Sequence, residues 1–302
     1  MNVTAQTPAR VKGPLVWLDM DQTELDDAYD QSKYAPNMDI MNRRRTAGSN
    51  AVRARLGMPA RYAYGETPIE GLDVFECGVA NAPIAVFVHG GGWRIGDAAS
   101  YAFGAETFVN AGAHYVPLDF TNVDKTGGDL TPMVEQICRA IGWIYRSAGT
   151  FGGDPNRIYL FGHSSGAHLA GVVLTTEWER LGLPRDVLKG GVTCSGMYDL
   201  EAVRLSARSS YVNFTDEMVD ALSSQRHIDR ITCPVTVLIG DCETPEFQRQ
   251  AREFAAALKA AGKLADYQIG VGLNHFEISE TLGNPYGLFG RAALAQMGLA
   301  PA

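Results

Sequence analysis

The sequence lacks any long apolar run. No stretch of its 302 residues reaches the roughly 20 consecutive apolar residues that a membrane-spanning helix needs. The first residues, MNVTAQTPARVKGPLVWLDMDQ, also lack the apolar core of a secretory signal peptide. We therefore expect a cytoplasmic protein with no membrane partner.

Cysteine is scarce and has no regular spacing. The chain has five cysteines, an odd number, and no two of them form a C-x-x-C pair. They are Cys77, Cys138, Cys194, Cys233 and Cys242. Zinc sites and disulfide frameworks both depend on regularly spaced cysteines. We expect reduced thiols and no metal site.

The chain also lacks an excess of positive charge. It has 26 basic and 34 acidic residues, which gives a formal net charge of −8 at pH 7. This balance disfavours nucleic acid and anionic membrane surfaces as partners, because both are negatively charged. With 46% hydrophobic residues, the chain can bury one large core. These features favour a single domain, residues 1–302, that acts on a small molecule.

Short apolar runs alternate with helical patterns along the chain, and several runs are apolar on both faces, as buried parallel strands are. The predicted strands are residues 61–65, 72–78, 83–89, 114–120, 157–162, 190–196, 234–240 and 265–270. The predicted helices are residues 101–111, 132–148, 166–175, 246–261 and 285–297. The alternation predicts an α/β fold with a mostly parallel eight-stranded sheet flanked by helices. In such sheets, ligands bind beyond the carboxyl ends of the strands.

Two segments interrupt the alternation. Residues 1–60 are mostly polar with helical patterns, and residues 198–231 separate two of the predicted strands. We expect both segments to fold over the carboxyl edge of the sheet as a small cap.

The run GHSSG, residues 162–166, is a G-x-S-x-G motif between an apolar strand and an Ala-rich helix. Its glycines allow a strained strand-to-helix turn that exposes the serine hydroxyl. The alternative is an ordinary glycine-rich turn, but the strand on one side and the helix on the other favour a nucleophile at Ser164.

A second glycine-rich run, HGGGW, follows another buried strand at residues 89–93. Acyl transfer needs unobstructed N–H donors for the negative oxygen of its tetrahedral intermediate. We assign this oxyanion hole to the N–H groups of Gly91 and Gly92, with Ser165 as the third donor. A dinucleotide or phosphate loop is the competing interpretation, but neither G-x-G-x-x-G nor G-K-[ST] is completed.

A serine nucleophile needs a base, and the chain offers six histidines. His275 lies after the last predicted strand, where the chain order serine, acid, histidine places the base. The acid should follow the strand between Ser164 and His275, in LIGDCETPEF, residues 238–247. Glu246 reads as a first-turn acid of a helix that Thr244 caps. Asp241 and Glu243 remain, and their position mildly favours Glu243.

These motifs give the chain a resemblance to the α/β-hydrolase superfamily, within it to the hormone-sensitive-lipase and arylformamidase (kynurenine formamidase) branch. The resemblance runs from about Asp26 to Met297 and rests on AYDQSKYAPN, LDVFECGVANAPIAVFVHGGGWRIGD, FGGDPNRIYLFGHSSGAHLAG, CSGMYDL, TPEFQRQAREFAAAL and GLNHFE. It implies Ser164 as nucleophile and His275 as base. The acid falls on Glu243, where such enzymes usually carry aspartate, and this departure leaves Asp241 open as the alternative.

The sequence therefore predicts a serine hydrolase that cleaves small carboxylic esters through an acyl-enzyme, with the triad Ser164, Glu243 and His275. No metal or organic cofactor is needed. An arylformamidase-like amidase acting on N-formyl aromatic amines is the alternative. A hydrolase fold used only to bind a ligand is a third hypothesis. The resemblance also suggests a homodimer.

Overall fold

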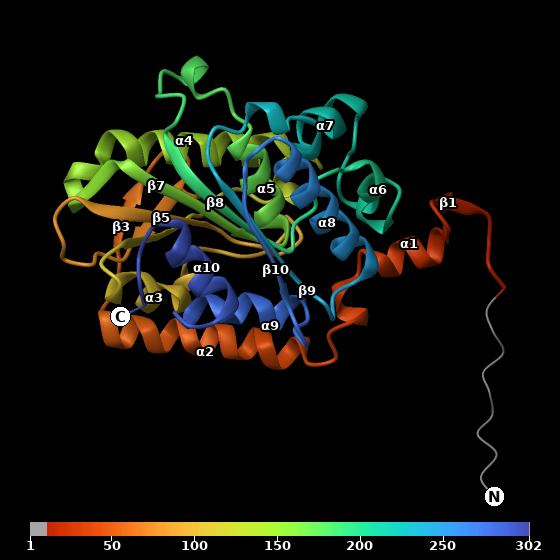
Figure 1. Ribbon diagram of the computed structural model, residues 1–302, viewed down its shortest axis with the longest axis horizontal. Coiled ribbons are helices and arrows are strands. Elements are labelled where there is room, and N and C mark those ends of the chain that lie inside the picture. The colour runs from red at the N-terminus through yellow and green to blue at the C-terminus, as the bar shows by residue number, and fades with distance from the viewer. Residues whose placement is uncertain (1–10, 302) are drawn as a thin grey trace, which may run out of the picture.

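A parallel sheet of six strands forms the centre of the molecule (Figure 1). The computed structural model describes residues 11–301, and residues 1–10 and 302 lie outside that description. In order across the sheet, the strands are β10 (Leu264–Gly270), β9 (Val235–Gly240), β8 (Leu188–Cys194), β7 (Gly153–His163), β5 (Ala82–Val88) and β6 (His114–Pro117). Every residue of β5 and β9 is buried, as expected for strands that are covered on both faces.

The sheet is narrower than the eight strands expected from the sequence, although all eight predicted positions do form strands. The remaining two, β3 (Ala60–Ala63) and β4 (Gly71–Val74), form a separate antiparallel pair. This pair meets the sheet beside β6 through two isolated bridges, Leu72 with Leu118 and Phe75 with Tyr115. Pro117 lies between the bridged residues and has no N–H to donate, so no continuous ladder can form along that side of β6.

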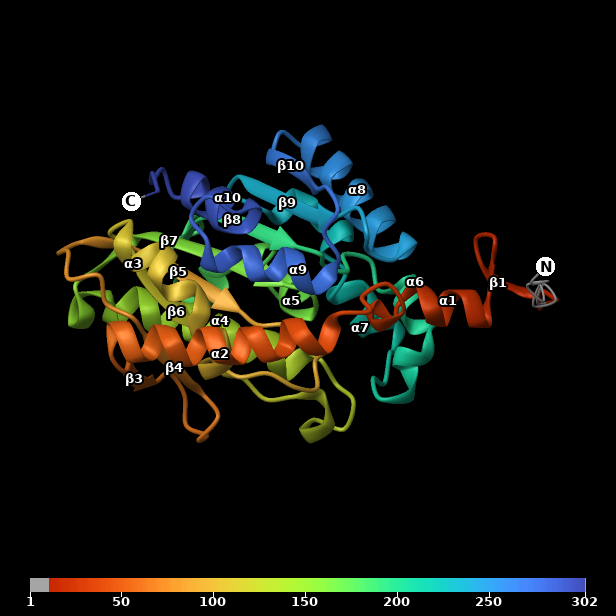
Figure 2. The same ribbon diagram turned by 90° about the horizontal axis from the view of Figure 1, so that it is seen from below.

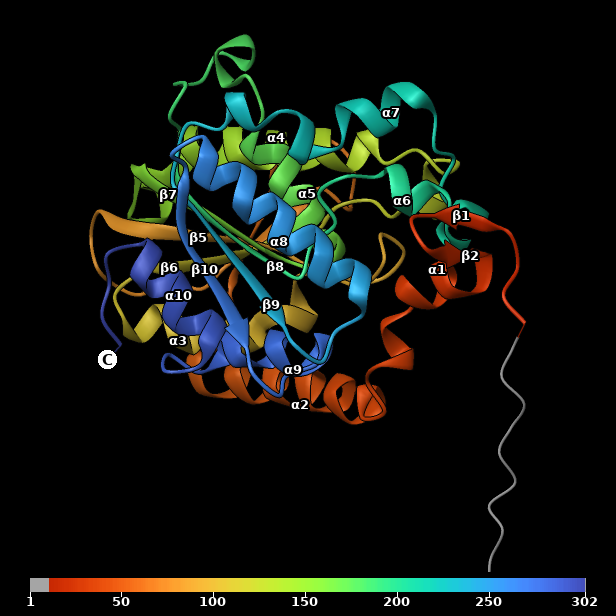
Figure 3. The ribbon, with the colours of Figure 1, turned by 45° about the vertical axis from the view of Figure 1, so that its right-hand side comes forward.

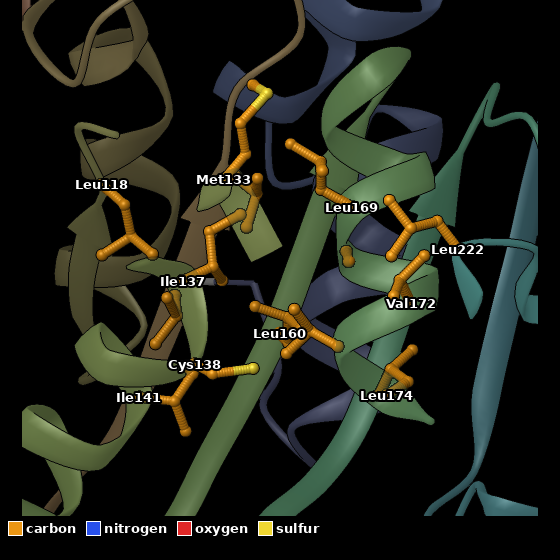
Figure 4. Close-up of a cluster of buried hydrophobic side chains, with 14 of the residues drawn as sticks. Leu118, Met133, Ile137, Cys138, Ile141, Leu160, Leu169, Val172, Leu174 and Leu222 are labelled. Carbon is orange, nitrogen blue, oxygen red and sulfur yellow. The ribbon is translucent and has the colours of Figure 1, made fainter. Parts of the chain in front are cut away.

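Helices cover both faces of the sheet. One face carries α4 (Thr131–Ser147), α5 (Ser165–Leu174) and α8 (Pro245–Ala260), and the other carries α3 (Ala105–Asn110) and α10 (Leu288–Gln296). Figure 4 shows part of the first layer, where Ile137 and Ile141 of α4 face Leu169 of α5 across Leu160 of β7. All four of these side chains are fully buried. Their burial fixes α5, and therefore the turn that precedes it, against the sheet.

The predicted helices at 132–148, 166–175 and 246–261 are confirmed within one residue at each end. The one predicted at 101–111 begins instead as a 3-10 helix, η2 (Ala99–Gly104), and continues as α3. The last predicted helix starts three residues late, as α10. His275, expected in a loop, is the first residue of α9 (His275–Glu280). The preceding Asn274 caps α9 by accepting from the N–H groups of Phe276 and Glu277.

The two segments expected to form a cap meet at one end of the molecule, although only part of the first segment does so. β1 (Leu15–Trp17), β2 (Met20–Asp21) and α1 (Gln22–Ala28) lie beside α6 (Glu201–Arg204) (Figure 3). Gln22 donates to the Leu205 carbonyl, and Asp26 accepts from the N–H of Ala207. α7 (Asp216–Ala221) follows α6 in the inserted segment.

α2 (Met38–Leu56), also expected in the cap, instead runs alongside η2 and α9 (Figure 2). Ser49 of α2 anchors it there, because its hydroxyl donates to the Ser100 carbonyl and accepts from the Phe103 N–H. Across residues 11–301, no helix is both long and apolar enough to cross a membrane.

Candidate active site

Ser164 lies at the sharp turn from β7 into α5. Its backbone has φ 57° and ψ −127°, a conformation that side-chain-bearing residues rarely adopt. Both flanking positions require glycine because neighbouring backbone leaves no room for a side chain. A Cβ on Gly162 would lie 2.4 Å from the Gly166 carbonyl oxygen, and a Cβ on Gly166 would lie 2.2 Å from the Val88 carbonyl oxygen. The G-x-S-x-G spacing therefore gives the strained turn that the sequence predicts.

The turn presents the Ser164 hydroxyl to His275. The hydroxyl oxygen lies 2.8 Å from His275 Nε2, and both residues are buried. The other ring nitrogen, Nδ1, lies 2.6 Å from Glu243 Oε2. Because a carboxylate oxygen accepts, the proton of this contact lies on Nδ1. Nε2 then carries the lone pair that can accept the serine proton.

The Glu243 carboxylate is fully enclosed by donors. Oε1 accepts from the Ser195 hydroxyl at 2.5 Å and from the Gly240 N–H at 2.9 Å. Oε2 accepts from His275 and from the Gln31 side-chain amide at 3.1 Å. These donors come from four separate segments and satisfy a carboxylate that is only 1% exposed.

The other two acids of LIGDCETPEF point elsewhere. Asp241 is exposed, and its Oδ1 accepts from the Gly272 N–H at 2.7 Å, so its carboxylate does not contact His275. Glu246 lies in the first turn of α8, as expected, but it is buried and paired with Arg249 at 2.7 Å. Thr244 occupies the N-cap position without making the expected side-chain capping bond.

The glycine-rich run after β5 lies against the turn. A Cβ on Gly90 would come within 2.9 Å of Ser164 Cβ, and the Trp93 N–H donates to Ser165 Oγ at 3.2 Å. Gly91 and Gly92 have positive φ angles of 125° and 62°. Within residues 11–301, the N–H groups of Gly91, Gly92 and Ser165 donate to no protein acceptor. The run therefore contacts the Ser164 turn through Gly90 and Trp93, and the three predicted oxyanion donors have no protein acceptor in the described chain that would occupy them.

Comparisons with known proteins find formamidases and esterases. The BD-FAE family model matches residues 72–183. A kynurenine formamidase from Danio rerio is 29% identical over 93% of this chain and 98% of its own. An isoprenylcysteine alpha-carbonyl methylesterase from Arabidopsis thaliana is 34% identical over 38% of this chain and 27% of its own. The solved structure of esterase LipW from Mycobacterium marinum superposes with a TM-score of 0.70 at 16% identity, covering 89% of this chain and 91% of that one.

The chain has an α/β-hydrolase fold, and these relatives support a hydrolase of the hormone-sensitive-lipase and arylformamidase type. A hydrolase of the esterase type needs room for a substrate beside its reacting groups. A pocket of about 300 Å³ borders the site, with Gly90 and Ser165 in its wall. The rest of the wall combines apolar side chains with polar ones. The apolar side chains are Ile69, Trp93, Ile95, Phe120 and Met133, and the polar ones are His89, Thr121, Asn122 and Lys125. The pocket therefore has room for a small substrate group that combines apolar and polar parts.

His89 of the hydrolase braces the glycine-rich run, as its position suggests. Its Nδ1–H donates to the Gly90 carbonyl at 2.9 Å, and its ring stacks on Phe120 with centroids 4.3 Å apart. Burial lowers the pKa of His89, so its ring is neutral.

Several contacts of the hydrolase's site were missed from the sequence, chiefly those from residues that hold Glu243. Gln31 belongs to η1 (Gln31–Lys33), far from the other site residues in the chain. Ser195 follows β8 with a positive φ of 57°. The quoted runs AYDQSKYAPN and CSGMYDL contain these two residues, but no periodicity or spacing links them to Glu243. For a metal, residues 11–301 offer no group of three or more His, Cys, Asp or Glu side chains placed to bind one.

Two further buried histidines flank the site. The Nε2–H of His163 donates to the His275 carbonyl at 2.9 Å, which holds the backbone of His275 in position. His168 accepts from the Trp93 indole N–H and donates to the Leu222 carbonyl. Burial lowers the pKa of His163 well below its usual value, and it lowers that of His168 to about 4. Both rings are therefore neutral in the folded enzyme at pH 7.

The neutral histidines predict that the hydrolase loses stability in mild acid. A histidine in the unfolded chain has a pKa of about 6.5, so below that pH the unfolded state binds protons that the folded state does not. His168 alone should lower the free energy of unfolding by about 2 kcal/mol between pH 6.5 and pH 5. Urea unfolding across this range measures the loss. The His168→Gln variant, which cannot titrate, should show a shallower pH dependence, and an unchanged slope would contradict the assignment.

Proposed function

We propose that this hydrolase cleaves small carboxylic esters by forming an acyl-enzyme on Ser164. The observation that carries the proposal is the unbroken hydrogen-bond chain from the Ser164 hydroxyl through His275 to Glu243, with distances of 2.8 Å and 2.6 Å. Serine is a weak nucleophile unless an adjacent base removes its proton. The arrangement supplies that base and a buried carboxylate that orients it.

In the proposed reaction, His275 Nε2 takes the Ser164 proton as the serine oxygen attacks the substrate carbonyl carbon. The carbonyl oxygen becomes negatively charged and accepts from the N–H groups of Gly91, Gly92 and Ser165. His275 then gives the proton to the departing alcohol, and the acyl group stays on the serine. Water repeats the sequence and releases the acid. Glu243 stabilises the charged imidazole without taking its proton.

An arylformamidase activity is the second candidate, in which the leaving group is an aromatic amine. It is favoured by the kynurenine formamidase relative, because that match extends over nearly the whole of both chains. The chemical steps are the same, since a formamide and an ester both pass through a tetrahedral intermediate. What differs is the basicity of the leaving group to which His275 gives its proton.

The proposed mechanism uses no metal or organic cofactor, and a small-molecule ester or amide is its partner. We also propose a cytoplasmic location. This proposal is supported by the five cysteines, all of which are unpaired thiols.

Replacing the nucleophile gives the first test. Ser164→Ala should abolish turnover of p-nitrophenyl acetate, because the variant has no hydroxyl to acylate. Initial rates follow the release of nitrophenolate, and circular dichroism checks that the variant is folded. Turnover by a folded Ser164→Ala variant at the wild-type rate would overturn the assignment. A wild-type protein that turns over neither esters nor formamides, but binds a small ligand tightly, would support the ligand-binding hypothesis.

The choice of acid predicts unequal effects of two conservative changes. Glu243→Gln should lower kcat by about 10⁴-fold, the typical cost of losing the triad acid in related chemistry. Asp241→Asn is the matched control, because Asp241 lies two residues away and does not contact His275. It should change kcat by less than about two-fold. If the aspartate change were the damaging one, the triad would be misassigned.

The two candidate activities are separated by direct competition. Short-chain p-nitrophenyl esters and N-formylkynurenine are compared by kcat/KM with the same preparation of enzyme. The proposal expects the larger kcat/KM for the esters. A formamide value that exceeds the ester values by tenfold or more would make the arylformamidase activity the correct one.

A further inference from the structure

Arg208 lies against the glycine-rich run, although it belongs to the inserted segment far along the chain. A Cβ placed on Gly92 would lie 3.5 Å from Arg208 Nη1, so the guanidinium borders the residue proposed to bind the oxyanion. The guanidinium carbon also lies over the Trp93 ring, 5.4 Å from the ring centroid. Arg208 therefore lies beside Gly92, one of the proposed oxyanion donors, and over Trp93, which lines the pocket.

Two neutral groups hold this side chain in place. Nη1–H donates to the Tyr211 hydroxyl at 2.8 Å, and Nη2–H donates to the Tyr29 carbonyl at 3.0 Å. Arg208 is half-buried, and its Nε–H is buried with no acceptor between residues 11 and 301. A guanidinium has five N–H donors, so these two contacts leave most of its capacity unused.

No carboxylate neutralises Arg208 within the part of the chain that the structure describes. The neighbouring Arg94 differs in this respect. Its guanidinium stacks on the Tyr211 ring, 4.9 Å from the centroid, and it forms an ion pair with Asp124 at 3.2 Å. The chain as a whole has a net charge of −8, so acidic residues outnumber basic ones, and yet Arg208 has no carboxylate partner among the described residues. An unpaired, partly desolvated guanidinium beside Gly92 can bind an anion.

We propose that Arg208 binds a carboxylate of the substrate, so that the enzyme prefers small esters or formamides that also carry an acid group. The proposal rests on the proposed hydrolase function and names its substrate class. A carboxylate can take two parallel hydrogen bonds from one guanidinium, which fixes its orientation as well as its charge. The pocket beside Gly90 and Ser165, whose wall includes Trp93, Phe120 and Lys125, takes the rest of the same molecule.

The experiment compares acidic esters with neutral partners of nearly equal shape. One pair places the acid on the acyl side: mono-4-nitrophenyl glutarate and its methyl ester. The other pair places it on the leaving group: 4-acetoxybenzoate and methyl 4-acetoxybenzoate. For each pair the readout is the ratio of kcat/KM for the acid to kcat/KM for the neutral ester. The ratio cancels any loss of active enzyme that a substitution causes.

Arg208→Met should lower this ratio by about 10- to 100-fold in at least one pair, as expected for losing a charge-assisted hydrogen bond. Arg94→Met is the matched control, since it removes an adjacent arginine that Asp124 already neutralises, and it should leave the ratio within about two-fold.

Two results would overturn the inference. One is an unchanged ratio in both pairs, including the case in which Arg208→Met slows acidic and neutral esters equally because it merely tethers the inserted segment. The other is an equal fall of the ratio in Arg94→Met. The preference for acidic esters would then come from the overall positive charge near the site and not from binding by Arg208. Failure of the proposed function is distinct, since wild-type enzyme would then hydrolyse neither member of either pair.

Discussion

The buried hydrogen bond between Glu243 and His275 is the contact on which the site depends. A carboxylate removed from water is costly unless its oxygens are fully hydrogen-bonded. Glu243 meets that requirement with donors from η1, the end of β8, the end of β9 and the start of α9. The same contacts set the imidazole so that its free nitrogen faces Ser164. The position of the acid therefore determines both the direction of the base and the packing of four segments around it.

The start of the described chain contributes to this arrangement more than its distance in sequence indicates. Gln31 donates to Glu243, and the Tyr29 hydroxyl donates to Glu246 and accepts from the Gln250 side chain. The Tyr29 carbonyl in turn holds Arg208. The short segment 29–31 thus contacts both Glu243, which holds His275, and Arg208, which is proposed to bind the substrate carboxylate. Its loss should disturb chemistry and specificity together.

The strands, the Ser164 turn and His275 could be predicted because each depends on local features, such as apolar runs, close glycine contacts and chain order. The choice between Asp241 and Glu243 could be predicted only as a mild preference for Glu243, because residues two apart on an extended chain share a direction. Gln31 and Ser195, from distant segments, make the distinction. The short helix beginning at His275 did have a local signal, since Asn274 and Glu277 form a capping box. Its six residues were too few to show a helical period.

The central claim is that catalysis passes through an acyl group on Ser164, and trapping that intermediate tests it most directly. The enzyme is mixed with an ester whose acyl group is released slowly, quenched in acid within the first turnover, digested and analysed by tandem mass spectrometry. The account predicts one acyl group per active enzyme, attached to Ser164 of the GHSSG turn. An acyl group on another residue, or turnover with Ser164 unmodified throughout, would contradict it.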